Sequence, residues 1–320
     1  MTPHLIPSLL YNLFVRSQGL QDRKVIGPLW KRAYDSARHV FQGPVSTRIH
    51  DRKVLVNFGY TYPIFARRYP GFNQPLVELV HQAYVIAGRK AVTIVDVGAA
   101  VGDTVFLLER NCQGMVTKYI CVDGYAEFFD YLRENLGGRE DVALVYALLS
   151  ATSGSERVLI KTPSGTASAQ GDALAPSTTL DRVVESLGFP KIDVLKVDAD
   201  GFDGRILLGA HELLGRDMPA VIFEWHPGLC VQTGNSGLEH FQALNQRGYR
   251  TFIWFTKFGV FSHFSAAFDQ KAIQLLSEIC LRGRHSYDWH YDIVALHEKT
   301  ALSPLDIAEL RYAKRRESRW

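Results

Sequence analysis

The chain has 320 residues, a formal net charge of +3, 22% charged residues and 47% hydrophobic residues. This length suits one large domain with an appendage, and the composition is that of an ordinary globular protein. So small a net charge gives no argument for a nucleic-acid partner. The scattered cysteines are typical of reduced thiols in a cytoplasmic protein, without a zinc site or a disulfide framework. They are Cys112, Cys121, Cys230 and Cys280.

Residues 1–90 are predicted to form an N-terminal helical and aromatic cap. "LLYNLF" and "LWKRAYDSARHVF" place apolar residues at helical spacing with basic residues between them. A helix docked on the main domain explains this pattern, and a weak peripheral contact with a membrane surface or an anionic partner is the alternative. The proline-interrupted stretch from about residue 51 predicts loop or short strand, and a helix should begin near Gln74.

Residues 91–300 alternate between short apolar runs and helical stretches. This alternation predicts an α/β domain with a doubly wound, mostly parallel sheet and helices on both faces, the last strand antiparallel. Thr178 with Asp181 resembles a capping box that would begin one of the helices. The seven predicted strands are Val92–Asp96, Tyr119–Asp123, Val142–Leu148, Asp193–Asp198, Val221–Glu224, Thr251–Phe255 and Tyr291–Leu296.

Residues 301–320 end strongly basic and are predicted to form a C-terminal helix that begins at Ser303-Pro304. No apolar run approaches the roughly 18 residues of a membrane span, and the first residues lack the features of a secretory signal. We therefore expect no membrane span and a cytoplasmic location.

The loop Gly98-Ala99-Ala100-Val101-Gly102 follows the first predicted strand of the sheet. Ligands of open α/β sheets bind at the carboxyl ends of the strands, so this loop is a candidate ligand site. It is neither a P-loop nor G-x-G-x-x-G, because its glycines are spaced G-x-x-x-G. Asp103 opens the following helix and would repel a phosphate, whereas it would suit an amine or a hydroxyl. S-adenosylmethionine, which has no phosphate, is therefore favoured over NAD.

Asp123 ends the second predicted strand, 25 residues after Gly98. A carboxylate at this place can accept hydrogen bonds from both ribose hydroxyls of a nucleoside. A solvated turn aspartate would look the same in isolation, but the glycine loop before it favours the ribose interpretation.

"VDVGAAVGDTV" is similar to motif I of class I S-adenosylmethionine-dependent methyltransferases. The downstream block "TTLDRVVESLGFPKIDVLKVDADGFDGRILLGA", with the later "PAVIFEWHP" and "YDIVALHEK", resembles the FkbM-type methyltransferase family. The resemblance covers roughly residues 55–298 and implies a Rossmann-like fold. The family usually has Asn where Ala100 stands and Glu where Asp200 stands.

The resemblance implies a role in cofactor binding for residues at the ends of four strands. Asp96, Gly98, Ala99, Gly102 and Asp103 would surround the methionine end of S-adenosylmethionine. Asp123 would hold the ribose beside Gly124 and Tyr125, with Ala147 and Leu148 near the adenine and Asp198 near the reacting methyl group.

The family implies an O-methyltransferase that acts on a hydroxyl of a sugar or glycan, as in surface polysaccharide or natural-product glycoside synthesis. An alcohol must lose its proton to accept a methyl group, so a general base or a metal is needed. His226, Glu224 and Asp200 are the candidate bases. Asp198 and Asp200 could hold Mg²⁺, although a metal is not favoured because D-x-D is a weak motif.

Tyr60, Tyr62 and Arg67 are candidate acceptor-binding residues, because aromatic rings suit sugars and an arginine could bind a phosphate on a nucleotide- or lipid-linked sugar. A packed cap over the cofactor would explain the same residues. Two other functions stay open: an NAD-dependent oxidoreductase, and a non-catalytic cofactor-binding module of a polysaccharide-assembly complex. Nothing in the sequence specifies an oligomeric state.

Overall fold

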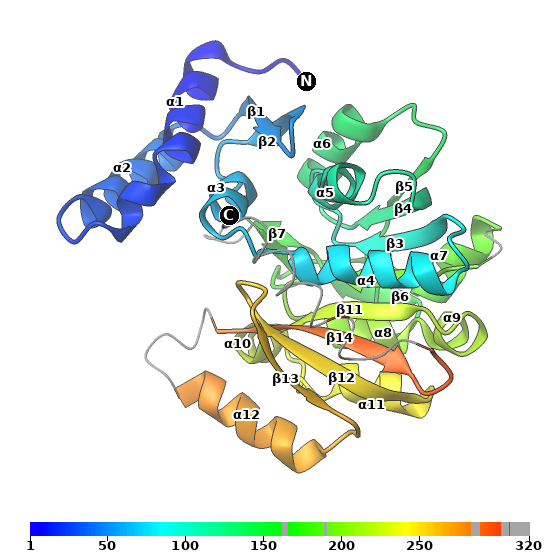
Figure 1. Cartoon of the computed structure of the whole chain (residues 1–320). Helices are drawn as coiled ribbons and strands as arrows, with labels where there is room; N and C mark the ends of the chain where they lie inside the picture. Colours follow the sequence, from blue (N-terminus) through cyan, green and yellow to red (C-terminus); the bar gives the residue numbers. More distant parts are fainter. Residues whose placement is uncertain (162–165, 189–190, 283–288, 302–306, 308–320) are drawn as a thin grey trace, which may run out of the picture.

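A mixed sheet of eight strands forms the centre of the molecule (Figure 1). The computed structural model describes residues 1–161, 166–188, 191–282, 289–301 and 307. In spatial order the strands are β13 (Phe261–Ser265), β12 (Tyr249–Thr256), β14 (Tyr291–His297), β11 (Ala220–Trp225), β10 (Val194–Val197), β3 (Val92–Val97), β4 (Val116–Asp123) and β5 (Val142–Tyr146).

The strand directions confirm the predicted doubly wound sheet. The strands from β5 through β4, β3 and β10 to β11 are parallel to their neighbours, whereas β14 is antiparallel to both β11 and β12. All seven predicted strands are present. The eighth, β13, was not predicted; it pairs with β12 alone as an edge strand.

Side chains of the central strands divide between two hydrophobic cores, one on each face of the sheet. Along β3, Ile94 belongs to one core, and Val95 and Val97 belong to the other. This alternation follows from the two-residue period of a strand, and it explains why strands buried on both faces read as continuous apolar runs. The helices around the sheet are α4 (Gln74–Ile86), α5 (Asp103–Asn111), α6 (Ala126–Leu136), α7 (Leu180–Ser186), α8 (Asp203–Leu208), α9 (His211–Arg216), α10 (Pro227–Gln232), α11 (Glu239–Gln246) and α12 (Gln270–Arg282).

The N-terminal part contains a β-hairpin that was not predicted as such. His50 and Asp51 form its turn with φ of 45° and 69°. Two successive positive φ values suit the twist of a tight hairpin, but the usual sequence signal is Asn-Gly, which this turn lacks. The elements of this part are α1 (Leu5–Arg16), η1 (Gln18–Asp22), α2 (Ile26–Val40), β1 (Pro44–Ile49), β2 (Arg52–Asn57) and α3 (Tyr62–Arg68).

Two further hairpins lie between β5 and α7, where the sequence suggested no structure. They pair β6 (Gly154–Arg157) with β9 (Leu174–Ser177), and β7 (Ile160–Lys161) with β8 (Ala167–Ser168). We call residues 154–177 the insertion. Its strands are only two to four residues long, which is too short for the period-2 pattern to stand out.

The predicted capping box of α7 is shifted by one residue. The capping side chain is that of Thr179, which accepts a hydrogen bond from the Arg182 N–H at 3.3 Å. The Asp181 carboxylate instead accepts from the N–H groups of Glu212 and Leu213, at the start of α9. The predicted basic helix over 301–320 lies outside the described residues, apart from positions 301 and 307.

Candidate active site

A cavity of about 820 Å³ opens at the carboxyl ends of β3, β4, β10 and β11. Between β3 and β10 the strand order reverses, and in open α/β sheets this switch point is where ligands bind. The cap and the insertion add walls that the sheet alone lacks. Those walls include Trp30, Tyr34, Tyr60, Ile160 and Ala167.

Successive N–H groups of the glycine loop after β3 donate hydrogen bonds within the protein. The N–H groups of Gly98 and Ala99 donate to the Val122 carbonyl at 2.9 and 3.2 Å. The Ala100 N–H donates to Asp123 Oδ2 at 2.8 Å. These groups are therefore not free to form the nest of N–H donors that binds a pyrophosphate. The loop geometry thus disfavours a dinucleotide, for a reason separate from the charge of Asp103.

The two glycines of the loop are needed for backbone geometry. Gly98 has φ of +76°, and a Cβ there would lie 1.8 Å from the Asp198 carbonyl oxygen. Gly102 has φ of +90° and packs against Leu136. Ala100 has φ of +46°, a conformation that Asn adopts more readily than Ala. The loop thus brings the ends of β3 and β10 together at the floor of the cavity.

Asp123 is held rigidly at the end of β4. Its Oδ2 accepts from the Ala100 N–H, and its Oδ1 accepts from the Tyr125 N–H at 2.8 Å. Burial raises the pKa of Asp123 to about 6, although these two backbone N–H groups favour the charged form. Each oxygen keeps a lone pair for a ligand hydroxyl. Beside it, Gly124 lies close to the chain after β5, because a Cβ there would lie 3.0 Å from the Ala147 carbonyl oxygen.

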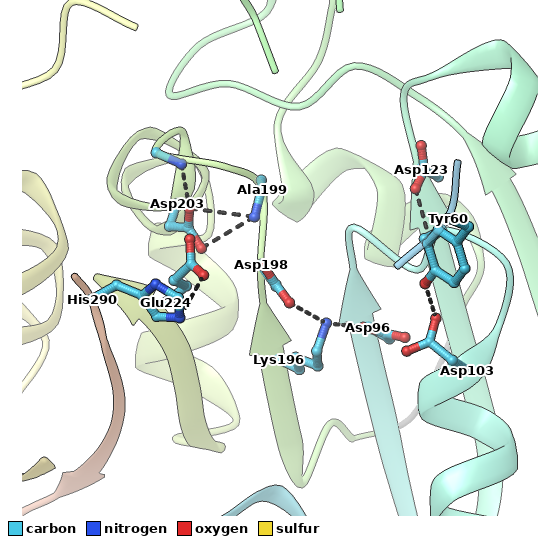
Figure 2. A network of polar contacts seen from close by, with 12 residues as sticks. Tyr60, Asp96, Asp103, Asp123, Lys196, Asp198, Ala199, Asp203, Glu224 and His290 are labelled. Carbon is cyan, nitrogen blue, oxygen red and sulfur yellow. Dashed lines mark hydrogen bonds and ion pairs between the residues drawn. The ribbon is translucent and has the colours of Figure 1, made fainter. Parts of the chain in front are cut away.

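Lys196 connects the two central strands through a buried ion-pair network (Figure 2). Its Nζ lies 2.9 Å from Asp96 Oδ1 and 3.4 Å from Asp198 Oδ2. Burial disfavours the charged ammonium, but the two carboxylates outweigh it and raise the pKa of Lys196. Lys196 therefore stays cationic on the cavity wall, a residue to which the sequence analysis gave no role.

The candidate acceptor residues differ in their placement. The Tyr60 hydroxyl donates to Asp103 Oδ1 at 2.6 Å, and the pKa of Asp103 is raised to about 7, chiefly by burial. The Tyr62 hydroxyl lies 2.8 Å from His50 Nε2. Both tyrosines line the cavity, so they offer it ring faces rather than uncommitted hydroxyls. The side chain of Arg67 is exposed and lies outside the cavity lining.

Acidic side chains gather where β10 and β11 end and the antiparallel β14 begins. Burial and the neighbouring Asp198 raise the pKa of Asp203 and of Asp292 to about 7. Burial and the same group of carboxylates raise the pKa of Asp200 and Glu224 well above their usual values. The Asp200 carboxylate is also hydrogen-bonded by the insertion, through the Ala167 N–H. This part of the cavity therefore favours cations or neutral proton donors.

Glu224 and His290 form a buried pair on the cavity wall (Figure 2). Glu224 Oε2 lies 3.4 Å from His290 Nε2. Burial and the adjacent His226 lower the pKa of His290 well below 6.5, so the imidazole is neutral. Glu224 Oε1 and His290 Nδ1 are buried and have no hydrogen-bond partner among the residues described. With the proton of the neutral imidazole on Nε2, next to Glu224, His290 Nδ1 would be an acceptor, and Glu224 Oε1 is an acceptor when the carboxyl is ionised.

His226 also lines the cavity at this place, but one of its ring nitrogens already has a hydrogen-bond partner. Its Nδ1 accepts from the Leu229 N–H at 3.2 Å and caps α10. In the neutral ring Nε2 then carries the proton. His226 would have to give up its capping bond to accept a proton, which makes it a donor at the cavity wall and a poor candidate base.

Most of the predicted site residues line the one cavity. They are Gly98, Asp103, Asp123, Gly124, Ala147, Leu148, Asp198, Asp200, Glu224, His226, Tyr60 and Tyr62. Asp96, Ala99, Gly102 and Tyr125 support this lining from behind, and Arg67 lies apart from it. The sequence analysis gave no role to four parts of the cavity wall: Lys196, His290, Asp292 and the insertion. Lys196 and Asp292 nevertheless belong to the motifs that resemble the FkbM family. No pattern pointed to His290.

Within the described ranges, no three His, Cys, Asp or Glu side chains gather in an arrangement that could hold a metal ion. The two candidate metal ligands have other partners: Asp198 forms an ion pair with Lys196, and the Asp200 carboxylate accepts a hydrogen bond from the insertion. None of the helices described is both long and apolar enough to cross a membrane.

Residues 96–251, which contain the glycine loop, Asp123 and the acidic strand ends, match the Methyltransferase FkbM domain. This segment is an FkbM methyltransferase domain. The match confirms the resemblance seen in the sequence, and S-adenosylmethionine is the cofactor that goes with this domain. Among curated proteins, none matches this chain.

Solved structures with similar folds include other methyltransferases. A methyltransferase FkbM from Methylobacillus flagellatus KT is 11% identical, with a TM-score of 0.39 over 64% of this chain and 44% of that one. The plantazolicin methyltransferase BamL, solved with a desmethyl plantazolicin analogue and SAH, is 11% identical, with a TM-score of 0.40 over 92% of this chain and 98% of that one. An O-methyltransferase from Bacillus cereus in complex with SAH is 12% identical, with a TM-score of 0.36 over 71% of this chain and 80% of that one. This chain therefore spans less than half of the first structure's length.

The Asp292 carboxyl should cost stability at neutral and higher pH. Because its pKa rises from 3.8 to about 7 on folding, the folded state binds the proton more tightly and loses stability as the pH rises from about 4 to about 7. We expect Asp292→Asn to stabilise the protein by about 1–4 kcal/mol at pH 8 and to have little effect below pH 4. Thermal unfolding at several pH values measures this. Asp172→Asn, at an exposed position, is the control, and an equal shift of Tm at every pH would contradict the prediction.

Proposed function

We propose that the FkbM domain transfers a methyl group to a hydroxyl of a sugar or glycan. The observation that carries this proposal is the pair of buried polar atoms, Glu224 Oε1 and His290 Nδ1, without partners among the described residues. Buried polar atoms of folded proteins are nearly always hydrogen-bonded, so a ligand with a donor is expected at this place. A hydroxyl supplies that donor and is itself the group to be methylated.

The residues present fit S-adenosylmethionine along the cavity. The part of the cavity lined by Gly124, Ala147 and Leu148 suits the adenine, and Asp123 suits the two ribose hydroxyls. Lys196 can pair with the carboxylate of the amino-acid end, and Asp198 or Asp103 with its ammonium group. When bound, this cofactor supplies a methyl group already activated on a sulfonium.

Glu224 is the proposed general base. His290 Nε2 lies 3.4 Å from Glu224 Oε2, and a proton on this nitrogen would orient the carboxylate and leave Oε1 for the acceptor hydroxyl. As the acceptor oxygen gains its methyl group, its proton passes to Glu224 Oε1. The raised pKa of Glu224 suits this role, because a base is most effective when its pKa approaches the working pH. His226 and Asp200, the other candidate bases, are committed to the α10 cap and the insertion.

The cap supports a sugar as the acceptor. Trp30, Tyr34, Tyr62 and Phe65 line the cavity from that side, and aromatic faces suit the C–H faces of sugar rings. The volume of about 820 Å³ is near the upper end of the roughly 300–1,000 Å³ of ligand sites. A cofactor and a second ligand of sugar size can therefore share it.

A binding titration followed by an acceptor screen tests the proposal. We expect S-adenosylmethionine and SAH to bind with micromolar Kd and NADH not to bind. Free, nucleotide-linked and glycan sugars would then be incubated with methyl-labelled cofactor, and the product should carry a new O–CH₃ group by NMR. Methylation on nitrogen or carbon would contradict the assignment. Cofactor binding without turnover on any hydroxyl would favour a non-catalytic module.

A further inference from the structure

The helical hairpin formed by α1 and α2 exposes large apolar side chains at its surface. Leu5, Leu9 and Leu13 recur every four residues along α1 and are 75%, 65% and 61% exposed. Leu29 and Val40 of α2 are 59% and 74% exposed. We call these residues, together with Ile6 and Val25, the outer face. Soluble proteins seldom expose so many large apolar side chains together unless they bind a partner.

The outer face lies away from both the partner helix and the body of the protein. The inner sides of the two helices meet through Phe14 of α1, whose ring centroid lies 5.4 Å from that of Trp30 and 5.2 Å from that of Tyr34. Tyr11, also on α1, is fully buried. The hairpin projects from one end of the molecule, coloured blue in Figure 1. The outer-face leucines are therefore not needed for packing within the described chain, and each helix is apolar on two sides.

The charge of the same segment identifies the kind of partner. Residues 1–40 contain six Lys or Arg against two Asp, a net charge of +4, whereas the whole chain carries +3. Arg16, Arg23, Lys24 and Arg32 are exposed and lie outside the cavity lining, whereas the exposed Lys31 belongs to that lining. Two copies that met through this face would bring two such positive segments together, which electrostatics disfavours. An anionic lipid surface would neutralise them while it buries the leucines.

We propose that the outer face of the α1–α2 hairpin binds the surface of an anionic lipid bilayer. The leucines would enter the boundary between headgroups and acyl chains, and the basic residues would contact lipid phosphates. The inner side of α2 lines the cavity through Trp30, Tyr34 and Arg38. One element would thus contact the lipid and form a wall of the acceptor site. The binding does not depend on the identity of the methyl acceptor.

Vesicle sedimentation of the full chain tests this proposal. Phosphatidylcholine vesicles would be compared with mixed phosphatidylcholine and phosphatidylglycerol vesicles. We expect binding to the mixed vesicles, and a fall of at least about tenfold in the partition coefficient for the triple variant Leu5→Gln, Leu9→Gln, Leu13→Gln. Arg23→Gln with Lys24→Gln should also lower it by about tenfold, and added salt should weaken the binding of the parent chain.

A matched control uses exposed apolar residues outside the hairpin. Leu174 and Val231 are 68% and 61% exposed, and their double substitution with Gln should leave vesicle binding unchanged. Circular dichroism would show that all variants keep the parent's secondary structure. Failure of the parent to sediment, or equal sedimentation of the triple variant, would overturn the proposal. A dimer in analytical ultracentrifugation that the triple variant dissociates would also overturn it, because a second copy would then cover the outer face.

Discussion

Glu224→Gln is expected to lower the turnover number by about 10²–10⁴-fold, the usual contribution of a general base. The amide keeps the shape of the side chain and can still contact His290, but it cannot take the proton of the acceptor hydroxyl. The Kd of S-adenosylmethionine should change little, because the proposed cofactor contacts lie on β3, β4 and β10. This separation of turnover from binding distinguishes a base from a residue that only maintains the fold.

The pH profile gives an independent check on Glu224. Burial and four neighbouring aspartates raise its pKa well above 4.5, so the proton is lost only as the pH rises. The turnover of the parent should therefore increase with pH as Glu224 loses its proton, and in Glu224→Gln this titration should disappear from the residual rate. Glu185→Gln, on an exposed position of α7, is the matched control and should behave as the parent does. If Glu224→Gln keeps full turnover, another group accepts the proton of the acceptor hydroxyl.

Gly98→Ala is expected to destroy the cofactor site. The added Cβ would lie 1.8 Å from the Asp198 carbonyl oxygen, and the residue would keep a φ of +76°. Either the loop or the end of β10 must move, which displaces Asp198 and the Ala100 N–H that holds Asp123. We expect a loss of about 1–3 kcal/mol of unfolding free energy and at least a hundredfold loss (~10²) in cofactor affinity.

Chemical denaturation and calorimetric titration with SAH would measure both effects of Gly98→Ala. Gly154→Ala is the matched control, since a Cβ at Gly154 would meet nothing within 4 Å and its φ is not positive. This control should retain parental stability and affinity. If Gly98→Ala folds and binds SAH as tightly as the parent, the close approach of the two strands is not what forms the site.

Local patterns in the sequence were enough for the fold and the cofactor loop. The strands β3, β4, β10 and β11 are buried on both faces, so each appears as a short apolar run between helices. The G-x-x-x-G spacing and Asp103 are contiguous, and together with Asp123 at the end of the next strand they predicted the cofactor that the family match supports. These features depend on neighbours in the chain, and periodicity or spacing therefore reveals them.

Some local details were beyond these patterns. The hairpin turn at His50 and Asp51 lacks the residues that usually mark positive φ. Thr179 rather than Thr178 caps α7, and the Asp181 carboxylate accepts a hydrogen bond from the Glu212 N–H at the start of α9 instead of completing a capping box. Arg67 points outward because the rotation of α3 on the body, rather than its sequence, decides which side faces the cavity.

The sequence by itself determined the order of strands and helices, the family, and the carboxylates available at the strand ends. Only the tertiary structure decided what those carboxylates can do. Glu224 and His290 come from different segments, and their pairing, the neutral state of His290 and the two unpartnered polar atoms arise from burial and register between β11 and β14. Likewise the capping bond of His226 and the exposure of the α1 leucines depend on how elements pack. Hydrogen-bond partners and burial are properties of the packed chain, so no local pattern can specify them.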